Sequence, residues 1–353
     1  MISNINTDRC YNELEDKLLS AYQEIQKSGQ VRNGKYCRLA EDELKKITGR
    51  KHARLFPSGT ISITVALLSW QIINQTVATT PYSYVASANQ PALLNRLNFY
   101  DINASGVLDV NERILGDAVI PVNLYGNCCD YDTLYKNINA TTKVIVDSAQ
   151  GLGSMYKDQP EGSRGDVAVF SFAVNKPVPT AGTHGALVWD DDAMTDHIIA
   201  VANNGKMSRN APIVNYGVNG EPFEIQASQI YYGLLEYKKW QNRRTQISTY
   251  YSNELQNLPV ELVTPGEWCT SNNHKFVLLS DKRNDLNSFL HTNDIESQLN
   301  YTDNLANYFS KQSYNLPNTE KFCSQCITIP NSQWLTDAEV EHVVDTVKKF
   351  YES

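Results

Sequence analysis

The sequence predicts an α/β protein whose larger part is built on a mainly parallel sheet and whose smaller C-terminal part is of the α+β type. Short apolar runs alternate with helical or loop stretches through much of the chain, as they do when helices cover both faces of a parallel sheet. A long helical pattern over 226–255 then leads into a shorter set of elements. Because 353 residues exceed the usual size of one domain, we expect a large domain over 1–240 and a small one over 241–353.

The chain is expected to begin with helices. Leu14, Leu18 and Ile25 recur at helical spacing within 10–27. A second helical stretch over 41–48 stops at Gly49, a residue type that commonly ends helices.

The alternating units come next, and they define the large sheet. The expected strands are 77–79, 118–122, 143–146, 166–170 and 186–189, with helical or loop stretches at 61–71 and 131–138. Ligands of such sheets bind at the carboxyl ends of the strands. In the small domain we expect strands near 275–279 and 327–329, and a final helix over 336–351 that opens with the capping-box pattern Thr-Asp-Ala-Glu.

Composition and charge exclude several classes of partner. The net charge is −8 and the pI is about 5.3, so nucleic acid is not expected as a partner. The apolar stretch 61–73 contains Ser, Thr and Gln and is too short to span a membrane. With no leader pattern at the start, we expect a soluble protein located in the cytoplasm, without a membrane partner.

Seven cysteines, an odd number, indicate reduced thiols. Cys323 and Cys326 form a C-x-x-C pattern that could be a redox motif or half of a zinc site. No second C-x-x-C accompanies it, and Cys326 opens an apolar stretch that resembles a short strand. We therefore expect a structural role for this pair and no metal site.

Several catalytic motifs are missing from the sequence. There is no G-x-x-x-x-G-K-[ST], no G-x-G-x-x-G after a strand, no H-E-x-x-H and no G-x-S-x-G. These absences argue against nucleotide hydrolysis, dinucleotide-dependent redox chemistry and serine hydrolysis.

Two segments at element ends could bind a charged ligand. Ser58, Gly59 and Thr60 stand directly before an expected helix, where free N–H groups can hold a phosphate, although such residues are also ordinary helix caps. Asp147 ends an apolar strand and could keep a pyridine nitrogen protonated, or simply cap the next helix.

Two further segments could contact a flat, reactive ligand. Lys176 follows the strand-like run 166–170 after a short loop, and a lysine in a partly apolar setting can form a Schiff base. The alternative is a surface lysine. Tyr84 follows another expected strand and could stack on a ring, or be a core residue.

The order and spacing of these segments resemble the DegT/DnrJ/EryC1/StrS family of sugar aminotransferases. The stretches that carry the resemblance cover nearly the whole chain: Ser28-Gly29 to Gly34, Ser58-Gly59-Thr60, Val122 to Gly126, the D-x-A-Q of Asp147 to Gln150, the F-S-F-x-x-x-K of Phe170 to Lys176, Gly217 to Asn219, and 328–340. The resemblance implies a pyridoxal 5'-phosphate enzyme of the aspartate-aminotransferase fold (type I), with a seven-stranded sheet flanked by helices.

The resemblance also implies a role for each matched residue. Lys176 is the Schiff-base lysine, Asp147 pairs with the pyridinium nitrogen, and Gln150 lies near the phenolic oxygen of the cofactor. Tyr84 stacks on the ring. The implied phosphate ligands are Ser58, Gly59, Thr60 and Ser171, with Asn219 reaching the phosphate in the neighbouring subunit of a homodimer whose active site lies at the interface.

The family's T-G-E-G-G segment is replaced here by Thr180 to Gly185, which lacks the Glu and contains His184. The Tyr-Arg that follows the family's Asn is replaced by Gly220-Glu221. These differences concern the substrate rather than the cofactor. His184 could touch the sugar or satisfy a local hydrogen bond, and the second interpretation is favoured.

The resulting hypothesis is transfer of an amino group from glutamate to a nucleotide-linked keto-sugar for glycan biosynthesis. On family analogy, the expected substrate is dTDP-4-keto-6-deoxyglucose, which would give dTDP-4-amino-4,6-dideoxyglucose (viosamine). The alternatives are a 3-keto-sugar or cyclitol acceptor, or a non-catalytic sensor or scaffold. Lys176 argues against the family's 3-dehydratase branch, which has His at that position.

Overall fold

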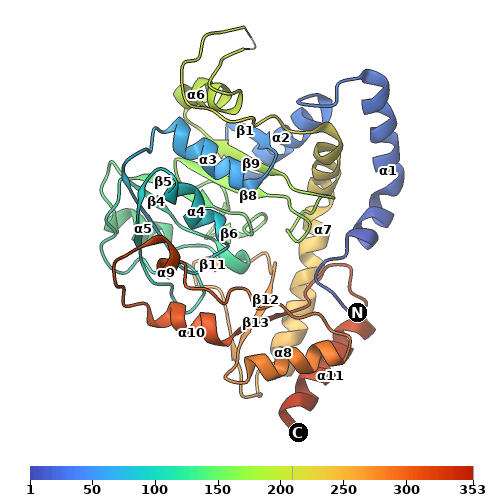
Figure 1. Ribbon diagram of the computed structural model, residues 1–353. Coiled ribbons are helices and arrows are strands. Elements are labelled where there is room, and N and C mark those ends of the chain that lie inside the picture. Colours follow the sequence, from blue (N-terminus) through green and yellow to red (C-terminus); the bar gives the residue numbers. More distant parts are fainter. Residues whose placement is uncertain (209, 353) are drawn as a thin grey trace.

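A seven-stranded sheet forms the centre of the computed structural model, which describes residues 1–208 and 210–352 (Figure 1). The strand order is β1-β9-β8-β5-β4-β2-β3. The strands are β1 (His52–Phe56), β2 (Thr76–Thr79), β3 (Arg96–Phe99), β4 (Ala118–Ile120), β5 (Lys143–Asp147), β8 (Val167–Ser171) and β9 (Gly185–Trp189). β9 pairs antiparallel with both of its neighbours, and the remaining pairs are parallel. The predicted mainly parallel sheet is therefore confirmed.

Helices cover both faces of this sheet (Figure 1). One face packs on α3 (Gly59–Ser69), α4 (Ala86–Ala92) and α6 (Asp192–Ala202), and the other on α1 (Thr7–Ser28), α2 (Lys35–Thr48), α5 (Tyr131–Asn137) and the first part of α7 (Glu224–Leu255). In β5, Val144 and Val146 enter the second of these cores while Ile145 enters the first. Since successive strand residues point to opposite faces, burial on both sides requires the continuous apolar runs seen in the sequence.

A separate core, apart from the two on the faces of the large sheet, surrounds a small antiparallel sheet. The strands of this sheet are β10 (Glu261–Leu262), β12 (Phe276–Leu279) and β13 (Cys326–Ile329). This core is completed by the end of α7, by α8 (Arg283–Thr292) and by α11 (Asp337–Glu352). The other elements are α9 (Ala306–Phe309), α10 (Pro317–Gln325), a 3-10 turn at Leu124–Gly126, and a sheet of β6 (Met155–Tyr156), β7 (Gln159–Pro160) and β11 (Cys269–Thr270).

Helix α7 contributes side chains to one core of the large sheet and to the core of the small sheet. Trp240 is buried with the large sheet, whereas Ile247 belongs to the small core. The predicted division at 240/241 thus falls inside one continuous helix, and the two-domain division stays a prediction.

Two strands of the large sheet were missed in the sequence, and the start of one helix was placed too late. β1 and β3 form the two edges of the large sheet, and about half of their residues are partly or fully exposed. They therefore lack the continuous apolar run that identifies a central strand. Helix α2 begins at Lys35, earlier than the expected 41.

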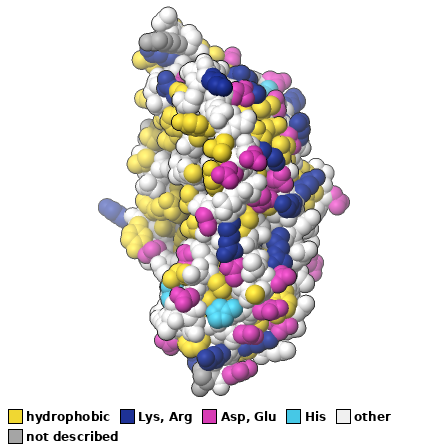
Figure 2. Space-filling model, turned by 90° about the vertical axis from the view of Figure 1, so that its right-hand side faces the viewer, with side chains coloured by type: hydrophobic (Ala, Val, Ile, Leu, Met, Phe, Trp, Pro, Cys, Tyr) yellow, Lys and Arg dark blue, Asp and Glu magenta, His cyan; other side chains and the backbone are white. Residues whose placement is uncertain are grey.

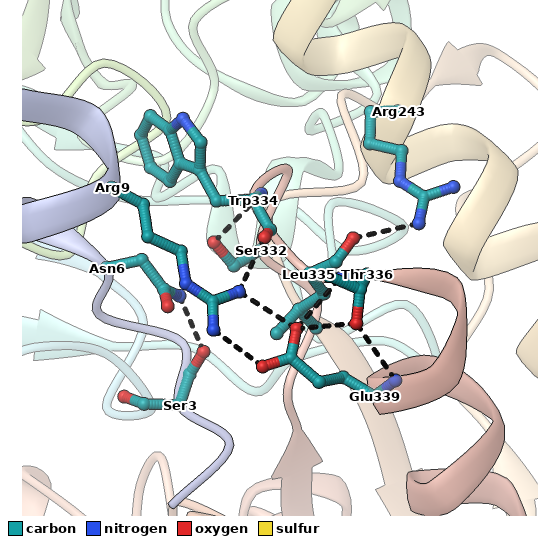
Figure 3. A network of polar contacts seen from close by, with 9 residues as sticks. All are labelled: Ser3, Asn6, Arg9, Arg243, Ser332, Trp334, Leu335, Thr336 and Glu339. Atoms are coloured by element: carbon teal, nitrogen blue, oxygen red, sulfur yellow. Dashed lines mark hydrogen bonds and ion pairs between the residues drawn. The ribbon is translucent and has the colours of Figure 1, made fainter. Parts of the chain in front are cut away.

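The capping box predicted for the last helix is present. Thr336 Oγ1 accepts the Glu339 N–H at 3.2 Å, and Glu339 Oε2 accepts the Thr336 N–H at 2.8 Å. Arg9 of α1 adds a two-pronged ion pair to Glu339, at 2.6 and 2.8 Å, and Arg243 of α7 binds the neighbouring Leu335 carbonyl (Figure 3). One carboxylate thus joins the N-terminal helix to the small domain.

Replacing this carboxylate should destabilise the protein. We expect Glu339→Gln to lower the free energy of unfolding by roughly 1–2 kcal/mol, because the charge-assisted pair with Arg9 is lost, while the amide can still accept the Thr336 N–H of the capping box. Arg9 lowers the pKa of Glu339 from 4.5 to about 2, so its contribution is full above pH 4.5 and disappears as the pH falls toward 2. Urea unfolding between pH 7 and pH 2.5 should show the wild type and the variant converging at low pH.

Asp337→Asn is the matched control for Glu339→Gln. Asp337 lies on the same helical turn as Glu339 and pairs with Arg243, but its side chain is 84% exposed. Loss of its charge should therefore change the free energy of unfolding by about 0.5 kcal/mol or less. Equal losses in the two variants at neutral pH would contradict the role given to Glu339.

Among the residues that the structure describes, none of the helices combines the length and the apolar character needed to cross a membrane.

Candidate active site

A cavity of about 340 Å³ opens where the parallel strands of the large sheet end. Segments that follow β1, β2, β4, β5 and β8 line it, and a further wall comes from 274–275 and 300–301. The structure brings together eight of the residues singled out in the sequence: Ser58, Gly59, Thr60, Tyr84, Asp147, Gln150, Ser171 and Lys176. His184 and Asn219 are not among the lining residues.

One end of the cavity is suited to an anion. Ser58 caps α3 through its Oγ, which accepts the Ile61 N–H at 3.1 Å. The N–H groups of Gly59 and Thr60 have no partner inside the helix, since the first turn lacks preceding carbonyls. No described residue hydrogen-bonds to the hydroxyls of Thr60 or Ser171. Free N–H groups, free hydroxyls and the positive helix end together can hold a phosphate.

Close backbone approach shapes this end of the cavity. A Cβ on Gly185 would lie 2.4 Å from the Gly59 nitrogen, and a Cβ on Gly59 would lie 3.2 Å from the Ser171 Cβ. β9 can therefore pass directly beside the start of α3 only because position 185 carries no side chain.

Asp147 is held at the floor of the cavity and is 4% exposed. Its Oδ2 accepts the Ser87 hydroxyl at 2.7 Å, and its Oδ1 accepts the Ala149 N–H at 3.1 Å. Burial raises the pKa of this carboxyl, while the two hydrogen bonds and the nearby Lys176 lower it. A buried carboxylate in this setting favours a protonated nitrogen placed next to it.

Lys176 lines the cavity from the turn after β8. In this turn its backbone N–H donates to the Ala173 carbonyl at 3.0 Å. Burial of the amine lowers its pKa to about 8, and the charge of Asp147 opposes that change. A lysine with such a pKa has a substantial neutral fraction near physiological pH and can act as a nucleophile and as a base.

Gln150 is fixed by its neighbours. Its Oε1 accepts the Tyr125 N–H at 2.7 Å, which leaves the amide nitrogen to donate to the Tyr301 hydroxyl at 3.4 Å. The side chain therefore presents an N–H group to the cavity. Tyr84 is 57% exposed, and its ring centre lies 6.5 Å from that of Tyr301, so it lines the open side of the cavity.

His184 is buried outside the cavity lining. Its Nε2 accepts the Phe223 N–H at 3.2 Å at the start of α7, and its Nδ1 faces the Thr183 carbonyl. These partners assign one neutral tautomer, and burial lowers the pKa of the ring to about 4. This geometry agrees with the local hydrogen bond considered in the sequence and offers no contact to a ligand in this cavity.

Substitutions of His184 should affect stability more than substrate binding. We expect His184→Leu to lower the free energy of unfolding by about 1 kcal/mol, because it removes the part-buried hydrogen bond from the Phe223 N–H. His184→Gln keeps an acceptor and should lose less. Urea unfolding and the KM for the sugar check this. A KM raised about tenfold in both variants with stability unchanged would instead place His184 in substrate binding.

Asn219 lies away from the cavity of its own chain. It is exposed and pairs with Asn203 through an isolated backbone bridge. The described residues between them, 204–208 and 210–218, project beyond α6 at the top of the molecule (Figure 1).

The cavity residues that come from the part of the chain after α7 were not identified from the sequence as site residues: His274, Lys275, Asn300 and Tyr301. Lys275 was included only as the start of an expected strand. A charged residue at the beginning of an otherwise apolar strand was the signal available for it. Asn300 and Tyr301 follow no recognisable pattern, because their position depends on contacts with Tyr82 and Tyr125.

Cys326 begins β13, and its thiol lies 3.2 Å from the Asn300 carbonyl. Cys323 belongs to α10, and both thiols are free. Over residues 1–208 and 210–352, no three His, Cys, Asp or Glu side chains are grouped so that they could hold a metal ion.

Comparison with known proteins gives matches over most of the chain. The model of the DegT/DnrJ/EryC1/StrS aminotransferase family matches residues 12–348. The UDP-2-acetamido-2-deoxy-3-oxo-D-glucuronate aminotransferase of Pseudomonas aeruginosa is 25% identical over 97% of this chain and 98% of its own length. The dTDP-4-amino-4,6-dideoxy-D-glucose transaminase of Shigella dysenteriae is 26% identical over 90% of each.

The fold is also similar to solved structures. The NtdA protein of Bacillus subtilis with bound cofactor PMP superposes with a TM-score of 0.87 at 21% identity, over 99% of this chain and 84% of that one.

Proposed function

This chain belongs to the DegT/DnrJ/EryC1/StrS aminotransferase family and is a pyridoxal-phosphate aminotransferase; we propose that it moves an amino group from glutamate to a keto group of a nucleotide-linked sugar. The observation that carries the proposal is the meeting of Lys176, Asp147 and the free start of α3 around one cavity. A buried lysine, a buried carboxylate and an anion cradle are the three groups that this cofactor needs.

The residues present fit pyridoxal phosphate. The Gly59 and Thr60 N–H groups with the Ser171 hydroxyl would hold its phosphate, Asp147 its ring nitrogen, and Lys176 its aldehyde carbon. Gln150 would donate its N–H to the phenolic oxygen, and Tyr84 would cover one ring face. When bound, the cofactor supplies an electron sink for the carbon that gains or loses the amino group.

The remaining steps fall to side chains of the chain itself. Lys176 Nζ would take a proton from one carbon and return it to another, a task suited to a pKa of about 8. Asp147 would keep a positive charge on the ring nitrogen beside it. Its bonds from Ser87 and Ala149 hold the carboxylate in place during this work.

The sugar substrate differs among the relatives. Relatives are named for dTDP-linked 4-amino sugars and for a UDP-linked 3-oxo-glucuronate. We retain dTDP-4-keto-6-deoxyglucose, aminated at C4 to viosamine, as the first substrate to test. The 3-keto sugars are the next candidates because the family includes both.

We further propose a homodimer with the active site at the subunit interface. Asn219 does not line the cavity of its own chain, and the side chains of Met207, Ile213, Val214 and Tyr216, which precede it in the sequence, are exposed. Figure 2 shows hydrophobic side chains gathered on the upper part of the face that it displays. Exposed apolar patches of this kind often mark interfaces between proteins. A second copy could use this segment to bring its Asn219 to the phosphate.

We place the enzyme in the cytoplasm, because all seven cysteines are free thiols and reducing compartments maintain that state.

Absorbance spectroscopy tests the proposed reaction. The purified protein supplied with pyridoxal phosphate should show a visible band that is lost on addition of glutamate. Subsequent addition of keto-sugar nucleotides should restore the band, and ¹⁵N from labelled glutamate should appear in the sugar product. A protein that shows no band with the cofactor would contradict an enzymatic role and favour a scaffold.

A further inference from the structure

Lys275 is a second lysine in the cavity, and the proposed reaction does not use it. It stands immediately before β12, lines the cavity together with Lys176, and is 8% exposed. Its Nζ donates one hydrogen bond, to Gln298 Oε1 at 3.1 Å. An ammonium group has three N–H donors, so two remain for a ligand.

No carboxylate of the described chain pairs with Lys275. Glu296 is the one acidic group that raises its pKa, but that carboxylate bonds Ser3 and Gln298 instead. Gln298 Oε1 also accepts Asn300 Nδ2 at 3.1 Å, which fixes the acceptor that holds the lysine.

The surroundings of Lys275 are positive. Burial lowers the pKa of Lys275 to about 8, and the charge of Lys176 lowers it further. Burial also lowers the pKa of His274, and the charges of both lysines and Arg244 add to that change. His274 is 7% exposed, and no described residue hydrogen-bonds to its ring. The acidic side chain that lines this cavity is Asp147. A buried cation without a counter-charge is costly, and a neutral ligand would not supply that charge.

We propose that Lys275 binds a carboxylate of the molecule that reacts at Lys176, with His274 beside it as a second polar contact. Other residues, at the start of α3 and at Ser171, form the phosphate cradle, so we assign the anion at Lys275 to a substrate rather than to the cofactor. This inference rests on the proposed function for the identity of the substrate. The carboxylate could be that of the amino donor or that of an acidic sugar.

The first experiment measures binding without any reaction. Glutarate has two carboxylates and no amino group, so it is a probe of a carboxylate site. Calorimetry with the cofactor-loaded protein should show glutarate binding that weakens about 100-fold in Lys275→Met. Lys275→Arg, which keeps the charge, should retain at least about tenfold more affinity than Lys275→Met.

The second experiment assigns the source of the carboxylate. If the amino donor is bound, Lys275→Met raises the glutamate concentration needed for half-maximal loss of the visible band by about 100-fold. If an acidic sugar is bound, the glutamate step is unchanged. Wild-type protein then binds UDP-glucuronate more tightly than UDP-glucose, and Lys275→Met removes that difference. These nucleotide sugars differ only in the carboxylate.

Lys321→Met is the matched control for charge. Lys321 is an exposed lysine paired with Glu261, far from the lining residues, and its loss should leave all of these measurements unchanged. The visible band of each variant shows that the fold and cofactor binding survive.

The proposal is overturned if neither glutarate, glutamate nor UDP-glucuronate distinguishes Lys275→Met from the wild type. Failure of the proposed function looks different. In that case glutamate does not alter the band of the wild type, while the glutarate and nucleotide-sugar titrations still report on Lys275.

Discussion

Replacing Lys176 with Ala should abolish transamination, with kcat falling at least about 10³-fold. The variant loses both the amine that attaches the cofactor and the base that moves the proton. Borohydride treatment of the wild type followed by peptide mass spectrometry should find the cofactor on Lys176. The same treatment of Lys176→Ala should find none. Activity within tenfold of the wild type would exclude this lysine from the reaction.

The pH dependence of cofactor attachment tests the environment of Lys176. Only the neutral amine attacks an aldehyde, and burial lowers the pKa of this amine to about 8. The rate at which the apo-protein takes up pyridoxal phosphate should therefore rise with pH up to about 8 and then level off. A rate that continues to rise beyond pH 9 would indicate an ordinary lysine. Lys143→Ala, which removes a lysine paired with Asp166 outside the cavity, is the control.

Asp147→Asn should lower kcat by about 10²–10³-fold, the size of effect seen when one preorganised electrostatic group is removed. The amide keeps the shape of the side chain and can still accept a hydrogen bond from Ser87, but it cannot hold a positive charge on the ring nitrogen. Steady-state kinetics with glutamate and the keto-sugar gives the loss. A cofactor analogue methylated on the ring nitrogen carries that charge permanently and should restore part of the rate in Asp147→Asn.

Asp147→Asn also has an expected effect on Lys176. The carboxylate raises the pKa of this lysine, so its removal should move the plateau of the cofactor-uptake profile to lower pH. Ser87→Ala leaves the charge in place and removes one hydrogen bond, so it should reduce kcat by about tenfold or less. An Asp147→Asn variant that behaves like Ser87→Ala would show that the charge is not needed.

The central strands of the large sheet could be predicted because burial on both faces leaves a simple pattern. Val144, Ile145 and Val146 must all be apolar, as alternate residues enter two different cores. The edge strands β1 and β3 contact neighbours on one side only. Polar residues are tolerated there, and the pattern that would identify the strands is lost.

The residues of the candidate site also fall into those that a local pattern predicts and those that it does not. Asp147 and Lys176 could be found because each follows an apolar strand, and strand ends meet at one edge of a parallel sheet. Lys275 and Tyr301 belong to the part of the chain that follows α7. They come near Lys176 only because α7 carries the chain from one core to the other.

The sequence by itself determined the α/β class and the central strands, because periodicity is a local property, and it identified Asp147 and Lys176 at strand ends as candidate site residues. Only the tertiary structure decided that the segments 274–275 and 300–301 line the cavity, and that His184 accepts a backbone N–H instead of lining it. Those outcomes depend on contacts between segments far apart in the chain, such as Lys275 with Gln298 and His184 with Phe223. No local pattern encodes contacts of this kind.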